Sequence, residues 1–528
     1  MVARRFTEIS SAFVPLALTA SSGLLLVLAF PKFNLFPLSL VALAPLLVVA
    51  AREPSPFRRF LWGFLAGCVF FAGTCYWIYG VMHRYGGLGI AASAGVFILF
   101  VFVLALYWGF FSWLAGTLWR TSWGPIAVPF LWVALELARA HLFSGFPWLL
   151  LGYALTDYAT LARMARWTGV YGLSYLLVSL NVAWAWLWLR EKRKAAVSYL
   201  LIHLAFLAGL GLTASRESYP DDQKAFLVQT NIPQEVSWER WDLPTQSPLL
   251  ARLEDLTLQA VGQQAQPALV IFPEMPAPFY FWDDTFTRPY AEGIAQKTNS
   301  YFLTGIIAFV PGSNHTQPLN SELLLDPTGR PVSQYDKMHL VPFGEYVPLK
   351  NWLWFADNLT AEVGDFVPGD RVVVSTLPSG RLSGLICYEA IFPNLVRQFA
   401  RDGAEVLVNI SNDGWYGSTS ARDQHLLMAR MRAIENARYL LRATNTGITA
   451  VIRPDGRIAS QLPPDQPAVL EAKWAFQSRL TFYARYGDWF PILSSVLTLL
   501  ALAAAWRSQR QKASAGSGFP QPEKLAGP

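Results

Sequence analysis

The sequence predicts a multi-pass α-helical membrane domain joined to an extramembrane α/β domain. Hydrophobic residues make up 53% of the 528 residues and charged residues only 15%, whereas a soluble domain carries about 25% charged residues. Apolar stretches near the ~20 residues that a bilayer-spanning helix needs fill most of residues 1–215 and return near the end. Between them, strand and helix patterns alternate over residues 222–480.

Eight apolar stretches are predicted to span the membrane. Seven form a transmembrane domain over residues 1–215, and the eighth covers 487–507, before a disordered cytoplasmic tail over 508–528. The first stretch lacks the small-residue cleavage site of a signal peptide, so we expect it to be retained. The first seven are expected at 11–30, 35–51, 61–81, 88–117, 124–142, 168–190 and 195–213.

Few polar or sulfur-bearing side chains interrupt these stretches. Glu136 and Arg139 lie three residues apart in the fifth stretch, so they can pair on one helix face. Cys68 and Cys75 lie in the third stretch and are interpreted as packing residues. Cys387 stands alone in a polar region, which predicts a free thiol.

The charges of the loops predict the orientation. One set of alternate loops carries roughly three times as many Lys and Arg residues as the other, and such loops stay in the cytoplasm. Both termini are therefore expected to be cytoplasmic and the 222–480 domain to lie on the opposite side; a re-entrant stretch would invert this. The net charge of +6 is not gathered into a nucleic-acid patch. The richer set holds Arg4, Arg5, Arg52, Arg58, Arg59, Arg120, Arg190, Lys192, Arg193, Lys194, Arg507, Arg510 and Lys512, and the poorer set Lys32, Arg84, Arg163 and Arg166.

The extramembrane domain is predicted to be a layered α/β sandwich with a mixed sheet. Its short aliphatic runs are typical of buried strands, and amphipathic runs between them predict helices. A hairpin is expected over 449–456. The strands are expected at 225–230, 268–272, 301–310, 383–387 and 405–409, and the helices at 248–262, 285–298, 394–401 and 424–438.

Four residues of this domain are candidates for chemistry. Glu274 follows an apolar strand, Lys337 and Glu345 share a long loop, and Cys387 ends a strand. A thiol is nucleophilic as the thiolate, so a carboxylate must take its proton. A lysine and the backbone N–H groups at a strand end can stabilise the negative oxygen of a tetrahedral intermediate.

Each of these residues also has a plainer interpretation. A free cysteine is often a small buried hydrophobic residue, and a lone Glu or Lys is most often a surface charge. Glu274, Lys337 and Cys387 are separated by 63 and 50 residues. These spacings indicate a site only if the fold brings the three side chains together.

Six motifs occur in order along this domain: Phe272-Pro-Glu274, Tyr335-Asp-Lys337, Leu340-Val-Pro-Phe-Gly-Glu-Tyr-Val-Pro348, Cys387-Tyr-Glu389, Asn409-Ile-Ser-Asn-Asp-Gly-Trp-Tyr-Gly417 and Arg442-Ala-Thr-Asn-Thr-Gly447. They resemble the nitrilase superfamily, whose members use a Glu–Lys–Cys triad. With the apolar stretches, nearly the whole chain is similar to the membrane-embedded apolipoprotein N-acyltransferase family. The resemblance implies a nitrilase-like αββα sandwich on the periplasmic side of a bacterial inner membrane.

The resemblance also implies catalytic roles. Glu274 is expected to be the general base, Lys337 the cation that stabilises the oxyanion, and Cys387 the nucleophile. Glu345 resembles a second glutamate that holds or tunes the lysine. No metal or organic cofactor is implied.

Further residues match the family's motifs around the site. Tyr388 and Glu389 correspond to the pair after the nucleophile, and the Tyr388 N–H is expected to help bind the oxyanion. Trp238 and Trp415 match tryptophans that shape substrate access, although buried or interfacial anchors are an equal alternative. His339 departs from the commoner residue after the lysine and is interpreted as a bystander.

The implied reaction transfers an acyl chain from a membrane phospholipid, through a thioester, to the N-terminal amine of diacylglyceryl-cysteine on apolipoproteins. The enzyme is expected to work as a monomer and without nucleic acid. The aromatic segments 278–282 and 346–355 are expected to dip into the bilayer and screen the thioester from water. Ordinary loop packing is their alternative interpretation.

Two other functions are consistent with the residues. A membrane-anchored periplasmic amidase or nitrilase would use the same triad to hydrolyse C–N bonds, with water as the acceptor. An inert domain would instead dock lipoproteins or envelope partners. A long-chain acyl group on Cys387 favours the transferase, release of ammonia from amides favours the hydrolase, and complementation by a Cys387→Ala variant favours the scaffold.

Overall fold

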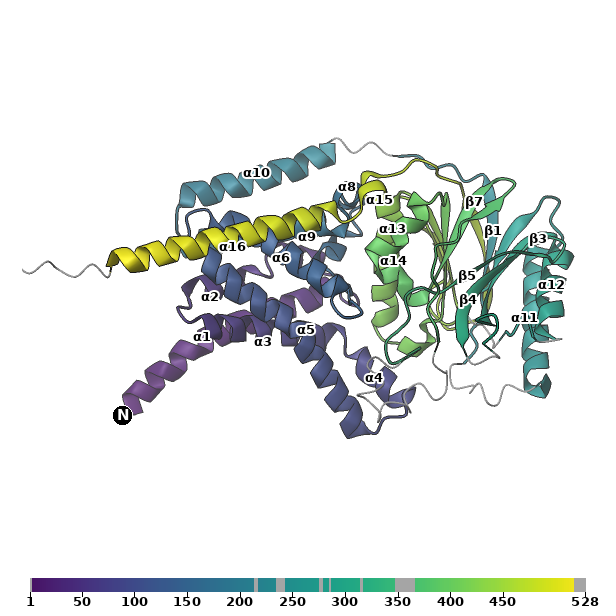
Figure 1. Ribbon diagram of the computed structural model, residues 1–528, viewed down its shortest axis with the longest axis horizontal. Helices are drawn as coiled ribbons and strands as arrows, with labels where there is room; N and C mark the ends of the chain where they lie inside the picture. The colour runs from purple at the N-terminus through teal and green to yellow at the C-terminus, as the bar shows by residue number, and fades with distance from the viewer. Residues whose placement is uncertain are drawn as a thin grey trace, which may run out of the picture.

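The computed structural model describes residues 2–212, 217–233, 243–274, 279–283, 286–313, 317–346 and 366–516. A helical half and an α/β half lie side by side (Figure 1). The segments connecting them are α15 (Phe482–Tyr486) and the residues around 217–222. The helical half consists of α1 (Val2–Ala29), η1 (Phe36–Leu40), α2 (Ala44–Arg52), α3 (Pro56–Thr74), α4 (Trp77–Arg84), α5 (Ile90–Leu118), α6 (Gly124–His141), η2 (Leu151–Leu155), α7 (Ala159–Ala162), α8 (Ala165–Thr168), α9 (Val170–Leu189), α10 (Arg193–Leu212) and α16 (Trp489–Gly516).

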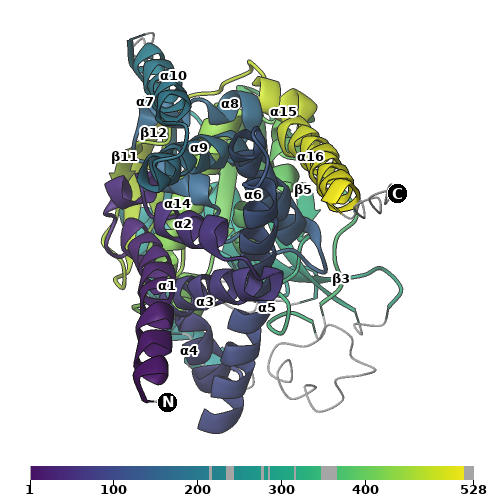
Figure 2. The same ribbon diagram turned by 90° about the vertical axis from the view of Figure 1, so that its left-hand side faces the viewer.

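The burial of these helices follows their position in the bundle. Helix α9 is apolar all round and buried along most of its length, as expected of a helix surrounded by others. Helices α10 and α16 lie on the outside (Figure 2). Only Ala196 of α10 is buried, while Leu201 and Ile202 are more than half exposed. Apolar side chains on such an outer face are solvated by lipid, so the chain is a membrane protein.

Several helices are apolar enough to cross a membrane. Within the part of the chain that the structure describes, four helices reach the required length on their own, namely α5, α9, α10 and the Trp489–Gln511 part of α16. The stretch predicted at 61–81 is not one straight helix, because α3 and α4 meet at an angle of 57° after Thr74; together they would form a fifth span. Phe13–Ala29 of α1 and Phe36–Arg52 are shorter apolar helices.

Glu136 and Arg139 on α6 interact through their charges, and both side chains also bind backbone groups of the segment that follows. Glu136 Oε1 accepts a hydrogen bond of 2.7 Å from the Leu151 N–H. Arg139 Nη1 donates to the carbonyl oxygens of Phe146 and Trp148 at 2.9 and 2.8 Å. This buried, irregular segment has no helical partners for its backbone, so side chains supply them.

The α/β half is a sandwich of two six-stranded mixed sheets, which confirms the predicted α/β class. The strand orders are β12-β1-β2-β3-β4-β5 and β11-β10-β9-β8-β7-β6. The central strands β1, β2 and β3 are parallel in the first sheet, as are β7, β8 and β9 in the second. The strands are β1 (Gln223–Gln229), β2 (Ala268–Ile271), β3 (Ser300–Phe309), β4 (Pro318–Leu325), β5 (Pro331–Asp336), β6 (Ser375–Leu377), β7 (Gly380–Ile386), β8 (Val406–Ser411), β9 (Tyr439–Thr444), β10 (Ala450–Ile452), β11 (Ile458–Gln461) and β12 (Ala468–Trp474).

Apolar side chains from both sheets form the core between them. Leu227 and Leu303 of the first sheet belong to the same buried cluster as Leu385 and Leu407 of the second. Helices α11 (Leu243–Val261) and α12 (Thr287–Thr298) cover one outer face, and α13 (Pro393–Arg401) and α14 (Ala421–Asn436) cover the other. The α13–α14 layer lies between the sandwich and the membrane helices (Figure 1). The layers are therefore α-β-β-α, with α14 at the boundary between the two halves.

Candidate active site

Four of the predicted site residues gather at the ends of strands from both sheets. Glu274 follows β2, Lys337 follows β5, and Glu345 lies in the loop after it, all from the first sheet. Cys387 follows β7 of the second sheet and begins the short helix η5 (Cys387–Ile391). The sandwich therefore brings together residues that are far apart in the sequence.

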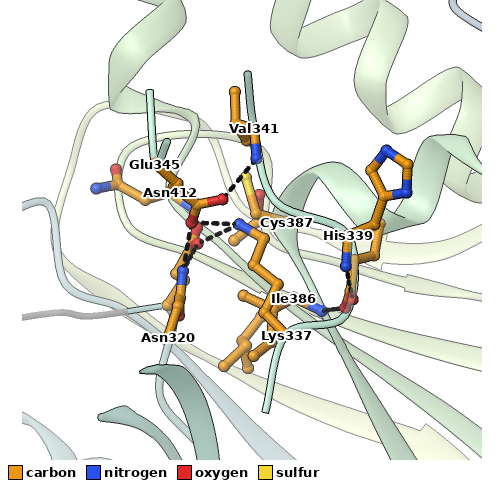
Figure 3. A network of polar contacts seen from close by, with 12 residues as sticks. Asn320, Lys337, His339, Val341, Glu345, Ile386, Cys387 and Asn412 are labelled. Atoms are coloured by element: carbon orange, nitrogen blue, oxygen red, sulfur yellow. Dashed lines mark hydrogen bonds and ion pairs between the residues drawn. The ribbon is translucent and has the colours of Figure 1, made fainter. Parts of the chain in front are cut away.

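Lys337 lies between the two carboxylates. Its Nζ is 3.1 Å from Glu274 Oε1 and 2.8 Å from Glu345 Oε1, and all three side chains are buried (Figure 3). Burial alone lowers the pKa of Lys337, but the two carboxylates more than offset it and raise the pKa above its usual range. The lysine is therefore a fixed, buried cation.

Asparagine and backbone donors complete the carboxylate network. The side-chain amide of Asn320, on β4, donates to Glu274 Oε1 at 2.9 Å and to Glu345 Oε1 at 2.7 Å. The backbone N–H of Asn412 donates to Glu274 Oε2 at 2.9 Å. The Val341 N–H donates to Glu345 Oε2 at 2.7 Å. Each carboxylate is thus held at both oxygens, which fixes its orientation; the contacts of Glu345 can be followed in Figure 3.

Cys387 lies next to this network in a restricted backbone conformation (Figure 3). Its φ angle is +47°, a left-handed value that non-glycine residues adopt only where the surroundings impose it. The residue is 5% exposed. Burial, followed by the charge of Glu274, raises the pKa of the Cys387 thiol, while Lys337 lowers it. The resting side chain is therefore a neutral thiol beside a carboxylate that can take its proton.

Glu389 organises the backbone on the other side of Lys337. Its carboxylate accepts hydrogen bonds from the Ile386 N–H at 2.8 Å and from the Tyr335 hydroxyl at 2.7 Å. It also accepts from the Met338 N–H at 2.8 Å and from the His339 N–H at 3.1 Å. One buried side chain therefore ties the residue before the cysteine to the residues after the lysine.

The remaining predicted residues lie around this centre. The Tyr388 ring packs on Phe392 with 5.1 Å between ring centroids, and the ring of His339 packs on the same Phe392. Trp415 is half-buried and its ring contacts Tyr85 at the end of α4. Trp238 lies outside the described residues, as do Pro278 of the first aromatic segment and residues 347–355 of the second.

Comparison with known proteins assigns the family. Residues 225–479 match the carbon-nitrogen hydrolase family, and residues 22–183 match the N-terminal domain of apolipoprotein N-acyltransferase. An apolipoprotein N-acyltransferase of Geobacter metallireducens is 39% identical over 481 residues, which are 89% of this chain and 91% of that protein. The chain belongs to the apolipoprotein N-acyltransferase family.

Other proteins are also similar. The apolipoprotein N-acyltransferase of Nitrosomonas europaea is 33% identical over 498 residues, which are 93% of this chain and 97% of that protein. A solved structure of an amidase from Nesterenkonia sp. is 21% identical with a TM-score of 0.36, over 50% of this chain and 95% of that one.

This member of the apolipoprotein N-acyltransferase family has a cavity of about 510 Å³ between its two halves. His141 and Ser144 at the end of α6 line it from the helical half. His339, Tyr346 and Phe392 line it from the α/β half. The volume lies in the range of small-molecule sites, roughly 300–1,000 Å³. The lining includes Met338, His339 and Leu340, which directly follow Lys337 in the chain, but none of Glu274, Lys337, Glu345 and Cys387.

Sequence patterns did not indicate Asn320, and the motif over 409–417 contains Asn412 but gave it no role. Asn320 lies inside a strand of otherwise ordinary composition, and its contact with two glutamates depends on the pairing of β4 with β3. Asn412 binds Glu274 through its backbone N–H, and the identity of a side chain does not predict such a contact. Asn320 is a polar residue within a buried strand. Because a buried amide needs hydrogen-bond partners, this position is the one feature that points to its contacts with other polar groups.

Proposed function

We propose that the chain transfers an acyl chain from a membrane phospholipid, through a thioester on Cys387, to the N-terminal amine of diacylglyceryl-cysteine on apolipoproteins. The observation that carries the proposal is the buried Lys337 held between Glu274 and Glu345 beside a buried thiol. Membership of the apolipoprotein N-acyltransferase family supports the acceptor.

The first half-reaction forms the thioester. Cys387 Sγ attacks the ester carbonyl carbon of the phospholipid while Glu274 takes the thiol proton. The negative oxygen of the tetrahedral intermediate is stabilised by the Lys337 ammonium group and by backbone N–H groups at the start of η5, that of Tyr388 among them. When the ester C–O bond breaks, Glu274 returns its proton to the oxygen of the departing lysophospholipid.

The second half-reaction forms the amide. The free amine of the lipoprotein attacks the thioester carbonyl, and Glu274 takes a proton from the nitrogen. The C–S bond then breaks, Glu274 returns its proton to the sulfur, and the acyl chain remains on nitrogen. Because a thioester is more reactive than an amide, this second half-reaction runs downhill.

Glu345 and Glu389 are assigned supporting roles in this scheme. Glu345 shares the charge of Lys337, which leaves Glu274 free to exchange a proton. Glu389 holds the backbone just after the lysine and just before the cysteine. Trp415 and Trp238 are assigned to substrate access, and the 510 Å³ cavity supports access from the boundary between the halves.

The proposed topology has eight membrane spans with both termini in the cytoplasm. Residues 1–215 form the transmembrane domain, 222–480 the periplasmic catalytic domain, 487–507 the eighth span, and 508–528 the cytoplasmic tail. The excess of Lys and Arg in alternate loops supports this orientation. The exposed apolar faces of α10 and α16 support a lipid environment for both. Such an arrangement gives the cysteine access to lipids of the outer leaflet.

The proposal is tested by reconstituting the purified enzyme in phospholipid vesicles with a synthetic diacylglyceryl lipopeptide. Wild type is expected to convert the lipopeptide to its N-acyl form and to release lysophospholipid in equal amount. Cys387→Ser is expected to do neither. Release of ammonia from small amides by the wild type, without N-acylation, would instead identify a C–N hydrolase.

A further inference from the structure

A histidine outside the predicted site contacts the backbone of the nucleophile. His425, on α14, places Nε2 3.1 Å from the carbonyl oxygen of Cys387. Its Nδ1 lies 3.0 Å from Asp413 Oδ1 and 3.1 Å from Arg442 Nη2. The side chains of His425, Asp413 and Arg442 are fully buried. None of the three has a part in the acyl-transfer steps given above.

The contact with Cys387 requires a proton on Nε2 of His425, because a carbonyl oxygen only accepts. Nδ1 faces Arg442, which only donates, and Asp413 Oδ1, which only accepts; it accepts from the first when unprotonated and donates to the second when protonated. Burial and the charge of Arg442 lower the pKa of His425, while Asp413 raises it. Asp413 in turn holds Arg442 at 2.7 Å.

This hydrogen bond acts on a backbone that needs support. Cys387 adopts a φ of +47°, a strained conformation for a non-glycine residue that persists only where its neighbours fix it. Glu389 holds the Ile386 N–H on one side of the cysteine. His425 holds the Cys387 carbonyl on the other. Together these two contacts define the direction in which the sulfur points.

The residue before the histidine attaches the same helix to the membrane half. Gln424 Oε1 accepts a hydrogen bond of 2.8 Å from the indole N–H of Trp148. Gln424 Nε2 donates to the carbonyl oxygens of Pro31 and Thr74, each at 3.1 Å. These groups come from three separate segments of the helical half. Consecutive residues of α14 therefore bind the membrane helices and the nucleophile.

We propose that His425 is a positioning residue that fixes the backbone of Cys387 for attack, and that Gln424 fixes His425 relative to the membrane helices. The placement of the sulfur then depends on the packing of the helical half. The inference rests on the proposed function, because it takes Cys387 as the nucleophile. It adds a role for residues that do not touch the substrate.

The test compares two substitutions of His425 in the reconstituted full-length enzyme. His425→Gln places an amide N–H near the position of Nε2, whereas His425→Asn reaches only the position of Nδ1. We expect His425→Asn to lower kcat about 100-fold, the order of loss that a displacement of about 1 Å causes, with KM for phospholipid within threefold of wild type. His425→Gln is expected to stay within tenfold of wild type. His203→Asn, on the outer helix α10, is the matched control and is expected to be unchanged.

Three results would overturn the proposal. One is a kcat for His425→Asn close to that of wild type. Another is a loss of kcat in His425→Gln as large as the loss in His425→Asn. If His425→Asn does not fold, His425→Gln alone tests the proposal, and a loss of kcat greater than tenfold overturns it. The third is a change confined to KM. If Cys387→Ser also retains N-acylation, the proposed function itself fails, which is a distinct outcome.

A double-mutant cycle tests the link to the membrane half. Gln424→Leu keeps the size of the side chain and removes its hydrogen bonds, so we expect kcat to fall about tenfold. In the His425→Asn background the same change is expected to have less than a threefold effect, because the contact that Gln424 supports is already lost. If the kcat loss of the double variant equals the product of the two single losses, the two residues act independently, which would contradict the link.

Discussion

The ammonium group of Lys337 lies 2.8 Å from Glu345 and 3.1 Å from Glu274. Glu345, to which no proton transfer is assigned, is thus nearer to the lysine than Glu274 is. A carboxylate that formed the sole ion pair with Lys337 would be a poor base, because the cation stabilises its ionised form. The positive charge of Lys337 is divided between two carboxylates, so Glu274 is not its sole partner.

Replacing Glu345 by glutamine is therefore expected to impair catalysis more than folding. Glu345→Gln keeps the shape of the side chain but leaves Lys337 paired with Glu274 alone. We expect kcat for N-acylation to fall about 100-fold, a typical cost for a lost electrostatic contact in an active site. Glu471→Gln, at an exposed ion pair with Lys224, is the control and is expected to be unchanged. Equal losses in both variants would contradict this role.

Asn320 is expected to be as important as the acidic residues that it bridges. Asn320→Asp places a third carboxylate against Glu274 and Glu345, where the amide now donates to both. We expect activity to fall about 100-fold or more and the unfolding temperature to drop, because buried like charges repel. Activity assays with thermal unfolding check this, and Asn299→Asp at the end of α12 serves as control. An active, stable Asn320→Asp variant would show that the bridging amide is dispensable.

The residues of the candidate site could be predicted from the sequence only where they belong to a motif. Glu274, Lys337, Glu345 and Cys387 each belong to a recognisable segment, and the structure brings them together. Asn320 and His425 were missed because their contacts are set by strand pairing and by the packing of α14, neither of which local sequence specifies. The backbone partners of Glu136 and Arg139 could not be predicted for a related reason: helical spacing makes a pair possible, but unsatisfied backbone groups of the next segment also bind both side chains.

Glu322 is expected to make stability depend on pH. It is buried between the sheets, and burial, with a contribution from Glu389, raises the pKa of Glu322 from 4.5 to about 8. Between these values the folded chain holds a proton that the unfolded chain has lost, so this residue's contribution to stability falls with rising pH, by at most about 1.4 kcal/mol per pH unit. Glu322→Gln cannot titrate. We expect its advantage in unfolding temperature over wild type to grow from about pH 5 to about pH 8; a constant difference would contradict the raised pKa.

Glu274→Gln is expected to speed the alkylation of Cys387 and to slow N-acylation. The charge of Glu274 raises the pKa of the thiol and Lys337 lowers it. Removing the first charge increases the thiolate fraction, so alkylation by iodoacetamide near pH 8 is expected to become several-fold faster. N-acylation is expected to fall about 100-fold or more, because no base remains to return a proton. Labelling of a Cys387→Ser variant gives the background from Cys68 and Cys75. Slower alkylation in Glu274→Gln would contradict the assigned charge arrangement.

The fold was predictable where the hydrophobic pattern is strong. Strands β1, β2, β3 and β8 and helices α12 and α14 lie close to their expected positions, because each has a clear period and clear end signals. Strand β12 was not predicted, since it pairs with β1 from a point more than 230 residues away. The bend between α3 and α4 was also missed, because the apolar run continues through Cys75 without a proline or a charge.

The central claim is that Cys387 carries the acyl chain between donor and acceptor. Intact-protein mass spectrometry after mixing the enzyme with a phospholipid of defined acyl length, without lipopeptide, tests it directly. We predict a mass increase of one acyl group, located on Cys387 and removed by hydroxylamine or by added lipopeptide. Absence of the adduct in an enzyme that N-acylates the lipopeptide, or an adduct on another residue that persists in Cys387→Ser, would contradict the claim.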